Sequence, residues 1–194
     1  MNKLQLRSIG LAIAVGLGSV AMIGCTTTPA GSEASGPSER AAMDKNVDAT
    51  LSRLYTTVPG SREMLQRAAG TLVFPSVVGG SFVVGAEYGR GALREGGRTT
   101  GYYSTTAGSI GFQAGGQSKA VIYVFNTREA LEKFKNSKGW TAGVDATVAV
   151  GKIGANGSVD TETMKQAVSS FILTNVGLEA GASVGAAKVT RISL

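Results

Sequence analysis

The sequence predicts an α+β fold with a mainly antiparallel, strongly curled sheet of short Gly-rich strands and a few helices packed at one end. Apolar residues recur with helical spacing before residue 70, and after it they alternate or run continuously in short segments separated by glycines. Glycine accounts for 28 of the 194 residues without a collagen-like period, which suits tight turns between strands.

Residues 1–24 have the three zones of a secretory signal peptide. Lys3 and Arg7 form a basic start, an apolar stretch follows, and the small residue Gly24 comes last. The apolar stretch is shorter than the ~20 residues of a comfortable transmembrane helix. The segment Met22-Ile23-Gly24-Cys25 resembles a bacterial lipobox, in which the peptide is cleaved before the cysteine and the thiol is acylated. We therefore expect a lipoprotein that carries palmitate-type chains on Cys25.

An acylated Cys25 would attach the protein permanently to a bilayer, since each buried CH₂ contributes roughly 0.8 kcal/mol. The alternative is an ordinary secreted protein with an unpaired thiol, which oxidation or dimerisation would endanger. Thr26 follows the cysteine, and in lipoproteins of this type such a residue accompanies sorting to the outer membrane. The expected location is the bacterial cell envelope, facing the periplasm or the surface. Residues 25–38 are rich in Thr, Ser, Gly and Pro and predict a disordered tether.

A single folded domain is expected over residues 39–194. Its first segment is helical, with one apolar stripe formed by Val47, Leu51, Leu54, Tyr55 and Val58. Pro59-Gly60 ends this helix, and a second, short helix follows over residues 61–69. An amphipathic helix near an acylated cysteine has two uses, contact with the membrane or packing in the core, and both need the same face.

Short strands are expected from residue 71 onwards, interrupted by one more helix. The strands comprise residues 71–74, 81–86, 101–106, 109–113, 120–125, 144–150, 167–173, 177–183 and 187–192. The glycines of residues 94–98 predict a hairpin connection. Asn126 or Thr127 is positioned to cap a helix that carries Leu131 and Phe134 on its apolar side. Residues 155–163 read as a polar loop.

The composition excludes much of ordinary enzymology. The chain has no histidine and one cysteine, so a Ser-His-Asp triad, a His-ligated zinc and a multi-thiolate metal site are impossible. No G-x-G-x-x-G or P-loop spacing occurs. Asp160 and Glu162 could act as an acid/base pair only if their surroundings gave them different pKa values. They lie in a polar segment without the apolar surroundings that would do so. We expect no enzymatic activity, no metal or other cofactor and no nucleic-acid partner.

The order and spacing of glycines and aromatic residues resemble the SYLF domain family from about residue 40 to the C-terminus. The matching residues are Gly70, Val73-Phe74-Pro75, Gly79-Gly80, Gly85, Tyr88-Gly89, Gly91, Gly101-Tyr102-Tyr103-Ser104, Gly111-Phe112-Gln113, Gly115, Gln117-Ser118, Gly143-Val144-Asp145-Ala146, Gly151, Gly177-Leu178 and Ala180-Gly181. The resemblance implies a non-catalytic domain that binds membrane lipids, notably phosphoinositides and other anionic lipids. Some eukaryotic members bind actin, a partner that we do not expect for an exported bacterial protein.

The basic residues are concentrated in the middle of the chain. Residues 90–138 hold eight basic and three acidic side chains, within a formal net charge of +6 for the whole sequence. From the resemblance we expect Arg90, Arg94, Arg98 and Lys119 to bind the phosphates of anionic phospholipid headgroups. The alternative for these residues is a solvated basic face that keeps the protein soluble. For the whole protein, the alternative is an envelope structural or protein-interaction lipoprotein without specific lipid recognition.

Overall fold

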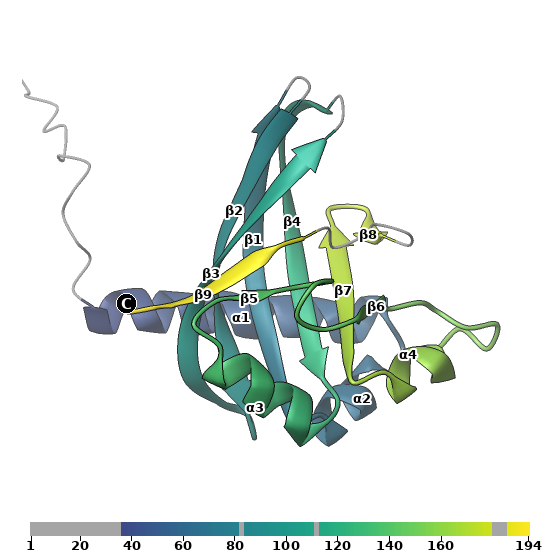
Figure 1. Ribbon diagram of the computed structural model, residues 1–194. Coiled ribbons are helices and arrows are strands. Elements are labelled where there is room, and N and C mark those ends of the chain that lie inside the picture. Colours follow the sequence, from purple (N-terminus) through teal and green to yellow (C-terminus); the bar gives the residue numbers. More distant parts are fainter. Residues whose placement is uncertain (1–35, 82–83, 111–112, 180–185) are drawn as a thin grey trace, which may run out of the picture. The chain divides into compact units, whose positions relative to one another are not determined.

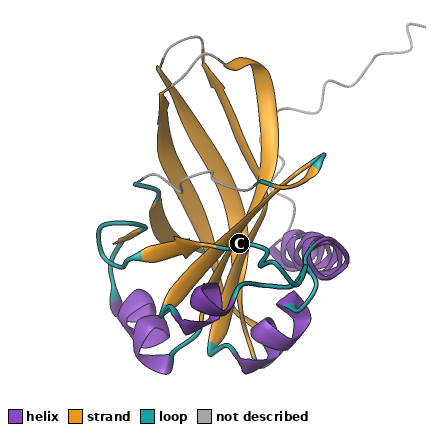
Figure 2. Cartoon of the chain, turned by 90° about the vertical axis from the view of Figure 1, so that its right-hand side faces the viewer, coloured by secondary structure: helices purple, strands orange, loops and turns teal. Residues whose placement is uncertain are grey.

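Nine strands form one sheet within the residues that the computed structural model describes, namely 36–81, 84–110, 113–179 and 186–194. Their order is β5-β9-β3-β2-β1-β4-β7-β6, and β8 pairs with β7. Of these pairs, only β6 with β7 is parallel. Figure 2 shows that the sheet is strongly curled. The strands are β1 (Gly70–Ser81), β2 (Val84–Glu95), β3 (Arg98–Ile110), β4 (Gln113–Phe125), β5 (Trp140–Thr141), β6 (Val148–Val150), β7 (Val168–Thr174), β8 (Gly177–Leu178) and β9 (Lys188–Ile192).

Four helices accompany the sheet in this part of the chain: α1 (Gly36–Thr57), α2 (Ser61–Arg67), α3 (Arg128–Asn136) and α4 (Thr161–Lys165). The helix α1 packs against β1 and β2, whereas α3 packs against β4. Figure 1 shows α2, α3 and α4 at one end of the long strands, while α1 crosses the sheet. The predicted fold class, an α+β fold with a curled and mainly antiparallel sheet, is therefore confirmed.

Both faces of the sheet carry a hydrophobic core. On the face that α1 covers, here called the outer face, Val47, Leu54 and Val58 pack with strand residues such as Val73 and Ile122. This confirms the core interpretation of the apolar stripe on α1. On the opposite, inner face, the core contains the rings of Phe74, Tyr103, Tyr123, Phe125, Phe134 and Trp140. Alternate residues of the long strands serve the two cores, as a pleated sheet requires.

Local predictions had mixed outcomes. The hairpin over residues 94–98 is confirmed, because Glu95 pairs with Arg98 and the intervening Gly96 and Gly97 have φ of 55° and 80°. Thr127 caps α3 by accepting a hydrogen bond from the Ala130 amide at 3.2 Å. The prediction of short strands is wrong for β1 to β4, which have 12 or 13 residues each.

Other segments were misassigned or lie outside the described residues. The predicted strand 144–150 is reduced to β6, and the predicted loop 155–163 runs into the first turn of α4. The predicted signal peptide (1–24), Cys25 and tether residues 26–35 lie outside the described residues, as do 82–83, 111–112 and 180–185. Residues 36–38, which were also predicted as tether, instead form the start of α1. None of the helices that the structure describes combines the length and apolarity needed to cross a membrane.

Candidate functional surface

The four predicted lipid-binding residues do not form one cluster. Arg90 and Arg94 lie on β2 and point to the outer face, where both contact α1. Arg98 is exposed at the start of β3, beyond the hairpin. Lys119 lies on β4 and shares the inner face with Val121, since Ala120 between them belongs to the outer core. The structure brings two of the four together and separates the others.

Arg94 is bound by acidic and carbonyl oxygens of α1 and of its own hairpin. Its Nη2 donates to Asp48 Oδ1 at 2.7 Å and to the Asp44 carbonyl oxygen at 3.2 Å, and Nη1 donates to the Gly97 carbonyl oxygen at 3.4 Å. Its side chain is only 14% exposed. Arg90 forms an ion pair with Glu39 of α1. These two arginines therefore help to hold α1 against the sheet.

The Asp44 carboxylate strengthens the same contact between α1 and the sheet. It accepts a hydrogen bond from Thr99 Oγ1 at 2.7 Å and weaker ones from the Tyr102 hydroxyl at 3.4 and 3.5 Å. Burial, followed by the negative charge of Asp44 and the hydrogen bond to it, raises the pKa of Tyr102. The Tyr102 hydroxyl thus stays a donor at physiological pH. A charge reversal of Arg90 and Arg94 would weaken this helix contact as well as any lipid contact.

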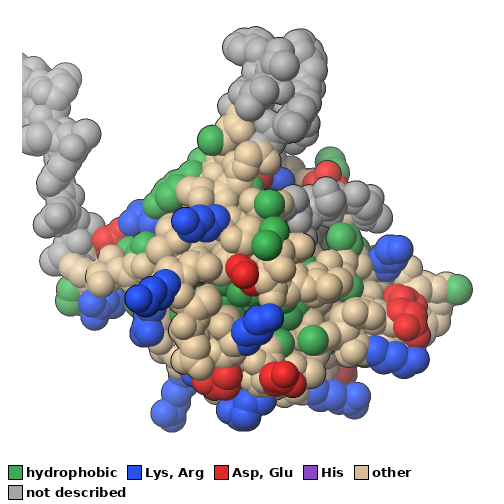
Figure 3. Space-filling view, viewed as in Figure 1, with side chains coloured by type: hydrophobic (Ala, Val, Ile, Leu, Met, Phe, Trp, Pro, Cys, Tyr) green, Lys and Arg blue, Asp and Glu red, His purple; other side chains and the backbone are tan. Residues whose placement is uncertain are grey.

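Lys119 is also paired within the protein. Its Nζ lies 3.0 Å from both carboxylate oxygens of Glu87 on β2. Arg98, in contrast, has no ion pair with any described residue. Figure 3 shows basic side chains scattered over the visible face, with no continuous basic area. Of the predicted set, Arg98 is therefore the residue without an acidic partner among the described residues.

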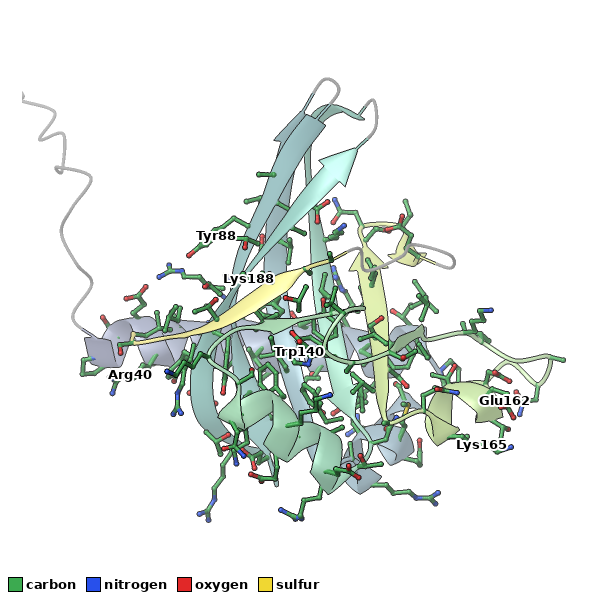
Figure 4. All side chains as sticks on the ribbon, in the orientation of Figure 1. Arg40, Tyr88, Trp140, Glu162, Lys165 and Lys188 are labelled. Carbon is green, nitrogen blue, oxygen red and sulfur yellow. The ribbon has the colours of Figure 1, made fainter. Side chains whose placement is uncertain are left out.

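A second surface emerges from the pairing of the long strands. Val78 on β1 lies opposite Tyr88 on β2, Tyr88 lies opposite Thr106 on β3, and Thr106 lies opposite Lys188 on β9. Directly paired residues point to the same face of a sheet, and all four are exposed. We call these four residues the Tyr88 row; Tyr88 and Lys188 are labelled in Figure 4.

The Tyr88 row lies on the outer face, in a part of the sheet that α1 leaves uncovered. It shares that face with Arg90, which is two residues from Tyr88 on β2. Val78 is 51% exposed and Tyr88 48%, although both are large apolar side chains in the middle of long strands. Sequence reasoning missed Val78 and Lys188 as site residues and treated Tyr88 only as a family marker. No local pattern reveals the row, because the pairing of β3 with β9 joins residues about 80 positions apart.

The fold and this surface define an α+β domain built on a curled antiparallel sheet with an exposed apolar and basic row. A comparison with protein-family models matches residues 106–192 to the family described as Ysc84: Las17-binding protein actin regulator. Over these residues, from within β3 to the end of β9, the chain matches the Ysc84/SYLF domain family, which confirms the predicted resemblance for this part of the domain. A search of curated proteins found no match.

Proposed function

We propose that the chain is a membrane-anchored lipoprotein whose SYLF domain binds the headgroups of anionic phospholipids through the Tyr88 row and Arg90 beside it, with Arg98, at the other end of β3, as a separate basic contact. The observation that carries this proposal is the exposed pair of Val78 and Tyr88, with Lys188 in the same row. The match to the Ysc84/SYLF family supports it, because the resemblance to SYLF domains implies association with membrane lipids.

The chemistry of the row fits the interface between water and lipid. Tyrosine places its apolar ring among acyl carbons and its hydroxyl among headgroups, and valine adds apolar area beside it. The long stem of Lys188 lets its ammonium group reach phosphates while its methylene groups stay near apolar surface. Arg90, 44% exposed beside the row, adds a second cation despite its pairing with Glu39.

The overall charge favours an anionic surface. The described residues include 17 basic and 12 acidic side chains, and five of the basic ones form ion pairs within this part of the chain. Each basic group near an anionic membrane contributes roughly 1 kcal/mol, and salt screens this attraction. The lipid contact should therefore weaken as ionic strength rises.

The proposed anchor makes a weak headgroup contact sufficient. Cys25 lies eleven positions before Gly36, the first residue of α1. A tether of this length would hold the domain near the bilayer at high effective concentration. Mass spectrometry of the processed protein tests this part, and we expect an acylated N-terminal Cys25. A mature protein with a free thiol at Cys25 would remove the anchor from the proposal.

Vesicle flotation of an unacylated chain that starts at residue 26 tests the lipid contact itself. This chain keeps residues 34–194, which form one compact unit. We expect it to float with vesicles that contain both phosphatidylglycerol and phosphatidylcholine, and to float less at high salt. It should not float with vesicles of phosphatidylcholine alone. The variant V78S/Y88S/K188E should lose at least about tenfold in binding, because it removes the apolar contact and reverses one charge.

A matched control changes the same kinds of side chain elsewhere. The variant I153S/V176S/K152E also replaces two exposed apolar residues and one exposed lysine, and it should float like the wild type. Equal loss in both variants would show that the row has no special role. If the wild type does not float at any salt concentration, the lipid proposal is wrong. The alternative of an envelope lipoprotein that contacts other proteins would then be tested by cross-linking.

A further inference from the structure

A cavity of about 440 Å³ lies beside Arg94, away from the Tyr88 row. Its walls come from α1, α2, the start of β1 and the hairpin between β2 and β3. The volume falls in the range of small-molecule sites. Polar and apolar groups contribute to the wall in similar measure, and the residues used below are Asp48, Tyr55, Leu65, Gln66, Thr71 and Arg94.

Arg94 has unused hydrogen-bonding capacity at this wall. A guanidinium has five N–H donors in a planar fork. Three contacts within the protein use Nη1 and Nη2, whereas the buried Nε has no acceptor among the described residues. The Nε is itself buried, but Nη1 has a second N–H that no described residue accepts, so an acceptor brought to Nη1 from the cavity would be bound favourably.

Asp48 supplies the opposite charge at the same cavity. Its Oδ1 accepts from Arg94, while the side chain remains 67% exposed, so the carboxylate can also accept a hydrogen bond from a ligand. The hydroxyl groups of Tyr55 and Thr71 and the amide of Gln66 add donors that carry no charge. Leu65 contributes apolar wall.

We propose that this cavity binds a small zwitterion that carries a phosphate and an ammonium group, the chemistry of a phosphoethanolamine headgroup. The phosphate contacts the free N–H of Arg94 Nη1 and the ammonium group contacts Asp48. A lipid source for this headgroup rests on the proposed membrane function; a soluble source does not.

The balance of charge at the cavity favours a ligand that carries both charges over a ligand that carries only one. The Arg94 guanidinium already lies 2.7 Å from Asp48 Oδ1 and 3.9 Å from Asp44 Oδ1, so two carboxylates would repel a lone anion. A lone cation at Asp48 would meet the positive charge of Arg94. A ligand with both charges satisfies both groups, and its opposite ends are held in one orientation.

Titration calorimetry with glycerophosphoethanolamine tests the proposal on the chain that starts at residue 26. We expect saturable binding, and at least tenfold weaker binding of glycerol 3-phosphate and of ethanolamine, because each half-ligand satisfies one charge only. Asp48→Asn should weaken binding at least tenfold; Asp48 is largely exposed, so this variant keeps the fold. Glu162→Gln, which neutralises a carboxylate that is 70% exposed on α4 and lies outside the cavity, should bind like the wild type.

A second variant keeps the test independent of any loss of α1 packing. Thr71→Val preserves shape and removes one hydroxyl from the wall, and should weaken binding measurably while thermal unfolding remains cooperative. Absence of saturable binding to the wild type, equal binding of glycerol 3-phosphate, or unchanged binding by Asp48→Asn would overturn the proposal.

Vesicle flotation distinguishes a lipid-borne headgroup from a soluble one. It also distinguishes failure of the cavity proposal from failure of the proposed function. A gain in flotation when phosphatidylethanolamine replaces phosphatidylcholine, lost in Asp48→Asn, assigns the site to a lipid. Binding of the soluble compound without that gain assigns it to a free headgroup. If the chain floats with phosphatidylglycerol but ignores glycerophosphoethanolamine, the cavity proposal fails and the proposed function stands. If it binds glycerophosphoethanolamine but never floats, the reverse holds.

Discussion

The four long strands have a base and an extension that differ in how their outer face is covered. The base comprises residues 70–77, 91–95, 98–103 and 120–125. Helices cover its outer face and packed aromatic rings cover its inner face. The extension comprises residues 78–81, 84–90, 104–110 and 113–119, and its outer face carries the exposed Tyr88 row. Figure 1 shows the strands continuing past α1. Buried packing is thus concentrated in the base, and the exposed apolar row lies in the extension.

The two regions also use aromatic side chains differently. In the base, the Trp140 ring lies 5.5 Å from the rings of Tyr123 and Phe134, between centroids, and Trp140 is 1% exposed. In the extension, Tyr88 has no ring partner among the described residues and is 48% exposed. An aromatic residue that contributes little to the core is free to serve as a contact.

The largest expected effect compares two aromatic truncations. Trp140→Ala should reduce the free energy of unfolding by about 3–5 kcal/mol, because it leaves a cavity among packed rings. Tyr88→Ala should cost less than about 1 kcal/mol, mainly through its contact with Val78. Urea denaturation of both variants measures the difference. Similar losses for the two would show that the extension is as tightly packed as the base.

A smaller effect is expected from two glycines. At Gly91, where β1 is irregular between Val73 and Ser76, an added Cβ would overlap the carbonyl oxygen of Val73. Gly91→Ala should therefore cost about 1–3 kcal/mol or more as the backbone shifts. At Gly108 in the extension, nothing lies within 4 Å of an added Cβ, so Gly108→Ala should change stability by less than about 1 kcal/mol. Thermal melts of the pair measure both values.

These glycines explain why the fold class was predictable and the strand lengths were not. Period-two and continuous apolar runs identified the strands, and the helical stripe identified α1, because burial imposes these patterns. Glycines were interpreted as ends of strands, as Gly96 and Gly97 are. Gly91 and Gly108 instead lie inside strands, where close backbone approach or simple exposure accounts for them. The presence of a glycine in the sequence does not show whether it ends a strand or lies inside one.

The candidate surface was less predictable than the fold. Charge counting located the basic middle of the chain, but it could not show that Arg90, Arg94 and Lys119 each face a carboxylate. Those carboxylates come from positions between 32 and 51 residues away in the sequence. The Tyr88 row likewise depends on strand order, which only the folded sheet defines. The proposed lipid role of Arg98 and of Cys25 stays a prediction.

The smallest expected effect concerns the Glu95 carboxylate at the base hairpin. Burial raises the pKa of Glu95, but hydrogen bonds from Thr100 and Lys135 and the charges of Lys135 and Arg128 outweigh it, so the pKa is lowered overall. A lowered carboxyl pKa contributes stability above the unfolded value of about 4.3, and this stability is lost as pH falls through the folded pKa. At neutral pH the wild type should melt at a higher temperature than Glu95→Gln, with a difference in the free energy of unfolding of under about 1 kcal/mol. This difference should vanish in acid.

The ion pair of Glu162 with Lys165 on α4 provides the control for this pH effect. Glu162 is 70% exposed and its partner 64%, whereas Glu95 is 20% exposed and also accepts a hydrogen bond from Thr100 at 2.6 Å. Glu162→Gln should therefore leave the pH dependence of the melting temperature unchanged, because water and salt screen an exposed pair. If Glu95→Gln also left it unchanged, the contact between the hairpin and α3 through Lys135 would contribute nothing to the base, and packing alone would distinguish it from the extension.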